Sequence, residues 1–204
     1  MTISRNISVL AQGASSSGIL AGGYGGLGAS VSPTTAGNVL FTADGSVWSS
    51  TQKIVRGTSV SASGTSIDFT SIPSWVKRIT VMFQGVSTSG TSNTLVRLGA
   101  GSIQSSGYLS GLGYTTTTTS GMLNNATGFI VHGANAAEVQ SGLFIIASLG
   151  SNVWVGSGSF KFSTVAAGFC GGDVTLSGTL DRISITTVNG TDTFDAGSVN
   201  ILYE

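Results

Sequence analysis

Few residues in this chain of 204 could carry out covalent catalysis or bind a transition metal, because it holds one histidine, His132, and one cysteine, Cys170. A nucleophilic triad needs a base, and His132 lies in the apolar run 129–132 with no Gly-x-Ser-x-Gly turn to supply a nucleophile. One histidine and one cysteine also fall short of the usual zinc ligand sets, and one cysteine excludes an internal disulfide. The sequence therefore predicts no catalytic residue, no metal and no cofactor.

Two further sequence patterns could suggest a nucleotide site and a metal site, but each has a simpler structural explanation. Residues 23–28 match the dinucleotide-binding pattern G-x-G-x-x-G, but the Pro-containing segment after them cannot form the helix whose N-terminus would hold a pyrophosphate. Asp192 and Asp195 could hold a calcium ion with the help of backbone carbonyls, although an Asx turn before the last strand is the simpler interpretation. We expect neither a nucleotide nor a metal at these positions.

The surface chemistry that remains is aromatic and hydroxyl-rich, and it gathers in residues 99–127. Tyr108 and Tyr114 flank glycines there, near Thr117 and Asn124. Flat rings beside amides and hydroxyls can stack on a sugar and hydrogen-bond its hydroxyl groups. A connection this long is usually functional or poorly ordered, although its threonine run is compatible with a further strand. These four residues form a candidate glycan site; the alternative is that the tyrosines pack at a subunit contact.

The low charge of the chain points to assembly. Charged residues make up 8% of it, against about 25% in an ordinary soluble domain, and the formal net charge is zero. Zero net charge gives no electrostatic basis for binding nucleic acid or an anionic membrane. We expect copies of the chain or a larger particle to cover much of this weakly charged surface. No apolar run approaches the roughly 18 residues of a membrane span, and residues 1–11 are too polar for a signal peptide.

The elements that would position the candidate residues are short β-strands. With 31 glycines and 2 prolines, the composition is typical of many strands joined by tight turns. The longest alternation, residues 76–86, places Ile79, Val81 and Phe83 on one face. The continuous apolar run 143–147 predicts a central strand that is buried on both faces or covered by a neighbouring subunit. The predicted strands are residues 66–70, 76–86, 94–98, 128–132, 142–149, 152–155, 159–165, 174–177, 182–188 and 198–203.

This pattern predicts an all-β fold, an antiparallel β-sandwich of jelly-roll type, over residues 57–204. Residues 1–56 are glycine-rich and have little to build a core with, so we expect a partner to order them. Within this N-terminal arm, Asp44-Gly45 between two β-prone runs predicts a short hairpin. The apolar residues of the arm that would contact its partner are Ile3, Ile7, Val9, Leu10, Tyr24 and Leu27.

Several segments resemble structural proteins of tailed bacteriophages. Residues 7–11, the glycine cluster after them and residues 37–48 (GNVLFTADGSVW) are similar to the repeated attachment segments of tail-fibre and appendage proteins. Residues 72–81 (IPSWVKRITV) and 194–204 (FDAGSVNILYE) are similar to C-terminal β domains of phage and prophage structural proteins. The chain departs from long fibres in having no extended repeat shaft.

The resemblance implies a homotrimer in a virion assembled in the bacterial cytoplasm, with the arm gripping tail or capsid proteins and the β domain projecting outward. We expect a non-enzymatic short fibre or appendage that recognises a host-surface polysaccharide, with several weak sites combined through multivalency. The alternative is a capsid decoration or cement protein that stabilises the head. A polysaccharide depolymerase is a third interpretation, which the shortage of candidate acids disfavours.

Overall fold

The computed structural model of the protein describes residues 38–42, 48–52, 54–132, 135, 136, 138–163 and 166–204. The chain divides into two compact units, residues 1–54 and residues 55–204. Every regular element among the described residues is a β-strand, which confirms the predicted all-β class. The described residues contain no helix with the length and hydropathy that a membrane crossing requires.

The first unit contains an antiparallel hairpin of β1 (Asn38–Thr42) and β2 (Trp48–Gln52). Asn38 pairs with Gln52 and Thr42 with Trp48, as expected of two β-prone runs around a turn. The predicted turn residues and the apolar residues of the arm lie outside the described part of the chain: Asp44, Gly45, Ile3, Ile7, Val9, Leu10, Tyr24 and Leu27.

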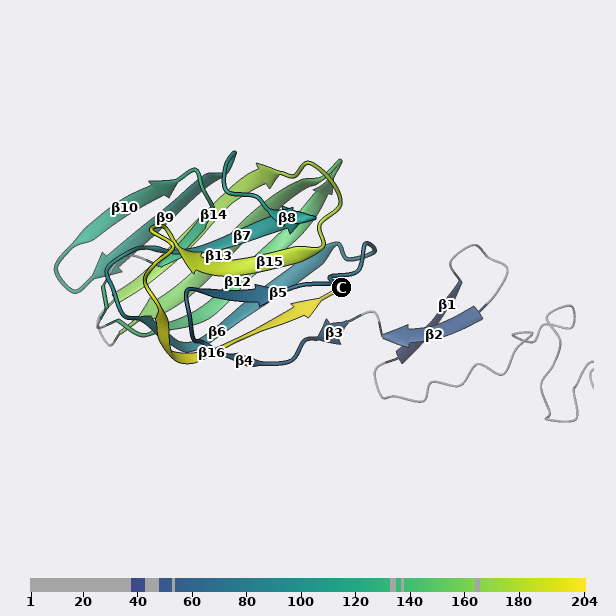
Figure 1. Cartoon of the computed structure of the whole chain (residues 1–204), viewed down its shortest axis with the longest axis horizontal. Helices are drawn as coiled ribbons and strands as arrows, with labels where there is room; N and C mark the ends of the chain where they lie inside the picture. Colours follow the sequence, from purple (N-terminus) through teal and green to yellow (C-terminus); the bar gives the residue numbers. More distant parts are fainter. Residues whose placement is uncertain (1–37, 43–47, 53, 133–134, 137, 164–165) are drawn as a thin grey trace, which may run out of the picture. The chain divides into compact units, whose positions relative to one another are not determined.

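The second unit consists of two antiparallel sheets, seen as two layers in Figure 1. The larger sheet has the order β10 (Ser120–Asn125), β9 (Leu109–Thr116), β14 (Ala166–Thr175), β13 (Val153–Phe162), β12 (Gln140–Gly150), β6 (Arg78–Thr88), β16 (Phe194–Tyr203) and β3 (Val55–Arg56), and β4 (Val60–Ser61) also pairs with β16. The smaller sheet has the order β11 (Phe129–His132), β7 (Thr94–Ala100), β15 (Arg182–Thr187) and β5 (Ser66–Phe69), and β8 (Ser102–Ile103) pairs with β7.

One hydrophobic core takes its side chains from both sheets. On β6, Ile79, Val81 and Phe83 are all buried, so the predicted alternation is confirmed. The rings of Phe129 on β11 and Phe144 on β12 have centroids 5.2 Å apart, a contact that joins the smaller sheet to the larger one. Burying such aromatic side chains supplies much of the stability that a sheet-on-sheet fold requires.

The two faces of β12 differ, although the strand is central in the larger sheet as predicted. Phe144 and Ile146 are fully buried on the inner face, whereas Leu143 on the outer face is 48% exposed. The prediction that both faces are buried is therefore wrong for a single chain. The outer face of β12 is therefore not covered in a single chain.

Glycines inside strands explain where the predicted strand boundaries fail. Separate strands were expected at residues 152–155 and 159–165, because the glycine-rich segment between them resembles a turn, but β13 runs through as one strand. A Cβ at Gly156 would lie 2.5 Å from the Phe144 ring on the neighbouring strand. Glycine is required here to admit a large side chain of the core, and it does not interrupt the strand.

The segment 99–127, expected to be a long connection, contains three strands, β8, β9 and β10. β9 and β10 form a hairpin in which Ser120 pairs with Thr115 and Asn125 with Ser110. The threonine run forms the end of β9 and the turn, in line with the tolerance of threonine for extended backbone. The expectation of a loop is thus corrected to a hairpin at the edge of the larger sheet.

Candidate functional site

A cleft of about 350 Å³ opens on the inner side of the β9–β10 hairpin. In Figure 1 this hairpin forms one end of the larger sheet. We call the site the hairpin cleft. It is lined by Asn93, Tyr114, Thr116, Leu123, Asn135, Glu138, Phe162 and Ala166. Apolar and aromatic side chains thus lie beside amide, hydroxyl and carboxyl groups in one concave site.

In each strand of the hairpin, every second side chain lies on the face that the cleft adjoins. Leu112 is fully buried on the inner face of β9, and Tyr114 and Thr116 share its parity. On β10, Leu123 pairs with Leu112 and Gly121 pairs with Tyr114. A Cβ at Gly121 would lie 2.5 Å from the Tyr114 hydroxyl oxygen, so the absence of a side chain there leaves room for the tyrosine.

Hydrogen bonds within the turn hold the tip of this hairpin. The Thr116 amide donates to the Thr119 carbonyl over 2.7 Å. The amides of Thr118 and Thr119 donate to the Thr116 hydroxyl oxygen over 3.2 and 2.9 Å. Thr116 therefore both lines the cleft and fixes the turn beside it.

The loop between β6 and β7 brings Asn93 to the cleft, and the Asp192 side chain holds this loop in place. Asp192 accepts hydrogen bonds from the Asn189 side-chain amide, over 2.7 Å, and from the Ser92 backbone amide, over 2.8 Å. These two bonds lower the pKa of the Asp192 carboxyl, the Asn189 bond having the larger effect. The Val188 amide also donates to the Asn93 carbonyl over 2.9 Å. The Asp192 carboxylate thus stabilises this loop, whereas the sequence suggested only an Asx turn at this position.

Glu138 is the carboxylate among the residues that line the cleft. Partial burial raises the pKa of its carboxyl above the usual value. A glycoside hydrolase commonly uses two carboxyl groups across the scissile bond, whereas the residues that line this cleft supply one. Among the described residues, no group of three or more His, Cys, Asp or Glu side chains could hold a metal ion.

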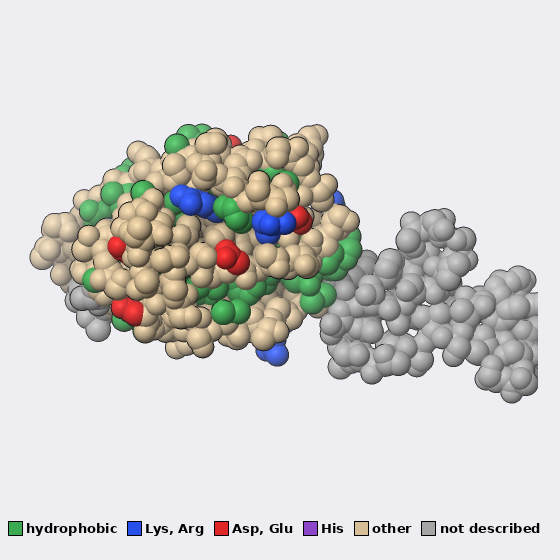
Figure 2. All heavy atoms as spheres, in the orientation of Figure 1, with side chains coloured by type: hydrophobic (Ala, Val, Ile, Leu, Met, Phe, Trp, Pro, Cys, Tyr) green, Lys and Arg blue, Asp and Glu red, His purple; other side chains and the backbone are tan. Residues whose placement is uncertain are grey.

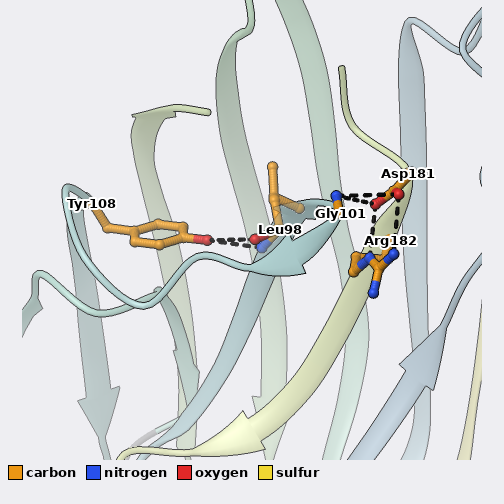
Figure 3. Close-up of polar contacts among 5 residues, drawn as sticks. All are labelled: Leu98, Gly101, Tyr108, Asp181 and Arg182. Carbon is orange, nitrogen blue, oxygen red and sulfur yellow. Dashed lines mark hydrogen bonds and ion pairs between the residues drawn. The ribbon is translucent and has the colours of Figure 1, made fainter. Parts of the chain in front are cut away.

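The structure places Tyr108 in the core, which corrects the expectation that its ring faces a ligand. Its side chain is 4% exposed and packs edge-on against Phe129, with ring centroids 5.1 Å apart. The Leu98 amide donates to the Tyr108 hydroxyl oxygen over 2.8 Å, as drawn in Figure 3. The Tyr108 hydroxyl can donate its one proton to the carbonyl oxygen of Leu98 or of Gln104, which lie 3.4 and 3.2 Å away. The Tyr108 hydroxyl thus provides a buried hydrogen-bond partner for the backbone of Leu98 in β7.

The burial of Tyr108 predicts a loss of stability at alkaline pH. Burial raises the pKa of its phenol to about 12, against about 10 in an unfolded chain. Between these values the folded state holds more protons, so its stability is complete below pH 10 and falls as pH rises toward 12. We expect the free energy of unfolding to fall by roughly 2–3 kcal/mol over this range, measured by urea denaturation.

Burial also raises the pKa of the Cys170 thiol to about 12, so this thiol would contribute to the same alkaline loss of stability. The effect of Tyr108 is therefore measured in a chain that carries Cys170→Ala. A Tyr108→Phe substitution there lowers stability near pH 7 by about 1–3 kcal/mol, because the buried Leu98 amide loses its acceptor. It should also remove the alkaline decline between pH 10 and 12. Equal alkaline declines with and without the phenol would contradict the assignment.

The other predicted glycan residues do not meet at one place. Tyr114 lines the hairpin cleft, Thr117 lies at the exposed turn beside it, and Asn124 is exposed with the parity of the outer face of β10. Sequence reasoning missed the other polar groups of the cleft, Asn93, Asn135 and Glu138. No local pattern marks these three, because loops distant in sequence bring them to Tyr114.

No protein-family model matches the chain, and no curated protein matches it either. The composition of the chain, the resemblance of individual segments and the geometry of the cleft are therefore the observations that bear on its function.

Proposed function

We propose that the chain is a non-enzymatic structural protein of a bacteriophage particle, a short fibre or appendage whose β domain binds a glycan of the host surface. Its N-terminal arm attaches to tail or capsid proteins, and several copies act together in the virion. The segments similar to phage structural proteins and the low charge support assembly into a particle. The finer fold assignment, a jelly-roll-like β-sandwich, is part of the proposal, supported by a chain that passes repeatedly between the two sheets.

The observation that carries the glycan assignment is the composition of the hairpin cleft. Tyr114, Leu123 and Phe162 supply apolar and aromatic surface, and sugar rings present apolar C–H faces to such groups. Asn93 and Glu138 add an amide and a carboxylate that hydrogen-bond sugar hydroxyls. An uncharged glycan also suits a surface with little charge. Figure 2 shows few Lys, Arg, Asp and Glu side chains on the visible face of the described unit.

An array of purified bacterial O-antigens and capsular polysaccharides, probed with the labelled full chain, tests this proposal. We expect Tyr114→Ala to weaken binding to the retained polysaccharide at least tenfold, about 1.4 kcal/mol, because the stacking surface is lost. Tyr114→Phe keeps the ring and should retain most of the affinity. Since Tyr114 also packs on the core, thermal denaturation of each variant accompanies the measurement.

The matched pair Asn93→Ala and Asn124→Ala supplies the control. Asn93 lines the cleft and Asn124 lies outside it, so we expect weaker binding for the first and unchanged binding for the second. Equal effects of the two substitutions would remove the cleft from the proposal. A chain that binds no polysaccharide but occupies many sites on a phage head would favour the decoration protein.

A further inference from the structure

The outer face of the larger sheet carries large apolar side chains that a single chain leaves in water. Leu109, Met122 and Phe169 are 73, 74 and 70% exposed, and Leu143 and Val155 are 48 and 39% exposed. All five have the outward parity of their strands. The solvated face of an antiparallel sheet is normally polar, and apolar side chains gathered on one face mark an interaction surface.

The strand register shows that these side chains are neighbours. One row of paired residues crosses five strands in the order Met122, Gly113, Phe169, Ser159 and Leu143. In this row Phe169 stands at the centre, with apolar residues at both ends. Leu109 and Val155 lie in a parallel row four residues along the strands.

Glycines make this surface flat enough for another sheet to pack on it. A Cβ at Gly113 would lie 2.7 Å from the Phe169 ring, so the ring lies against β9. In the row between the two apolar rows, Gly111 pairs with Gly171 and neither has a side chain. Two sheets pack face to face at about 10 Å when their facing side chains are of this kind.

Two charges lie at opposite ends of the same face. Lys161 lies on the outward face of β13 beside Ala167 of β14, where its amine donates to the Ala166 carbonyl over 3.3 Å, and Asp173 lies on β14 six residues beyond Ala167. Six residues of extended strand place them about 20 Å apart. Asp173 has the apolar residues Leu109 and Val155 as its direct neighbours on the adjacent strands. Because these neighbours carry no positive charge, a partner that covers this face could pair a cation with the Asp173 carboxylate.

We propose that this outer face packs on the same face of a second copy of the chain, related by a two-fold axis. A two-fold contact is self-complementary, and an axis midway between the two charges brings Lys161 of each copy to Asp173 of the other. The zero formal net charge of the chain means that copies do not repel one another. The face covers roughly 20 by 20 Å over five strands, about half of the roughly 800 Å² per partner of a standard interface, so we expect a weak and reversible contact.

The pairing is separate from glycan binding, since the hairpin cleft opens on the inner side of the sheet. A two-fold dimer also differs from the homotrimer that the phage resemblance implies. The molecular mass of the assembly in solution therefore discriminates between the dimer and the trimer. Analytical ultracentrifugation of the full chain, from about 1 to 100 μM, measures that mass. The expected result is a reversible dimer.

Phe169→Glu places two like charges at the centre of the contact and should raise the dimer Kd at least 100-fold. Because Phe169 is exposed in the single chain, the variant should fold as the wild type does, which circular dichroism checks. Val188→Glu makes a similar change at a half-exposed valine outside the larger sheet and should leave the mass unchanged. Lys161→Asp and Asp173→Lys should each weaken the dimer, and the double substitution should restore it.

A wild-type chain that remains monomeric at 100 μM would overturn the proposal. So would an assembly whose mass is insensitive to Phe169→Glu, because it would be held together elsewhere. Failure of the double substitution to recover what the single ones lose would overturn the two-fold arrangement. None of these results depends on whether a polysaccharide binds.

Discussion

Replacing Ile146 with Ala lowers the free energy of unfolding by about 2–5 kcal/mol, because it opens a cavity in the middle of the larger sheet. Ile146 is fully buried on the inner face of β12, and its neighbours in the register are Gly156 on β13 and Ile79 on β6. Gly156 has no side chain that could move into the space. Calorimetry should show the melting temperature falling by roughly 2–4 °C for each kcal/mol lost.

The matched control is Ile54→Ala, the same chemical change at a side chain that is 56% exposed. A surface substitution of this kind changes stability by about 0.5 kcal/mol or less. Similar losses for Ile54→Ala and Ile146→Ala would mean that the core does not lie where the structure places it.

Replacing Gly197 with Ala should cost about 2–5 kcal/mol, for two additive reasons. Gly197 has a φ of 88°, a left-handed conformation that costs an L-residue about 1–2 kcal/mol. A Cβ there would also lie 2.3 Å from the backbone oxygen of Gly85, in the irregular part of the β6–β16 pairing. Backbone cannot yield as a flexible side chain does, so overpacking adds about 1–3 kcal/mol.

Gly85→Ala separates these two contributions. Gly85 also has a positive φ, of 64°, but the nearest atom to a Cβ there is the Val139 Cγ1 at 3.8 Å. We therefore expect the conformational cost alone, about 1–2 kcal/mol, in urea denaturation of this variant. Equal losses for the two substitutions would show that steric conflict at Gly197 is relieved by movement of β16.

The strands with clean alternation were predictable from the sequence, whereas β13 and β14, in which several glycines stand between the apolar residues, were not. Ile79, Val81 and Phe83 alternate with polar residues, and β6 forms where the pattern indicates. β14 begins at Ala166, eight residues before its predicted start, because its glycines resemble turn residues. A Cβ at Gly168 would lie 2.6 Å from the Phe162 ring. Such a glycine is selected by a neighbour on another strand, which local sequence cannot reveal.

The candidate site shows the same division between local and long-range information. Tyr114 was identified because an aromatic ring among glycines and threonines suggests a binding surface. Tyr108 has the same local features, yet its contacts with Leu98 and Phe129 make it a core residue. Glu138 and Asn93 join the cleft through loops that no sequence pattern connects to β9. The type of chemistry was therefore predictable, but the set of residues depended on the fold.

The most direct test of the glycan proposal is an NMR titration of the ¹⁵N-labelled full chain with an oligosaccharide cut from the polysaccharide that the array retains. The proposal predicts that the amide signals of Asn93, Tyr114 and Thr116 shift with one saturating curve, while that of Phe169 on the outer face does not. No retained polysaccharide, or shifts confined to residues outside the hairpin cleft, would contradict it.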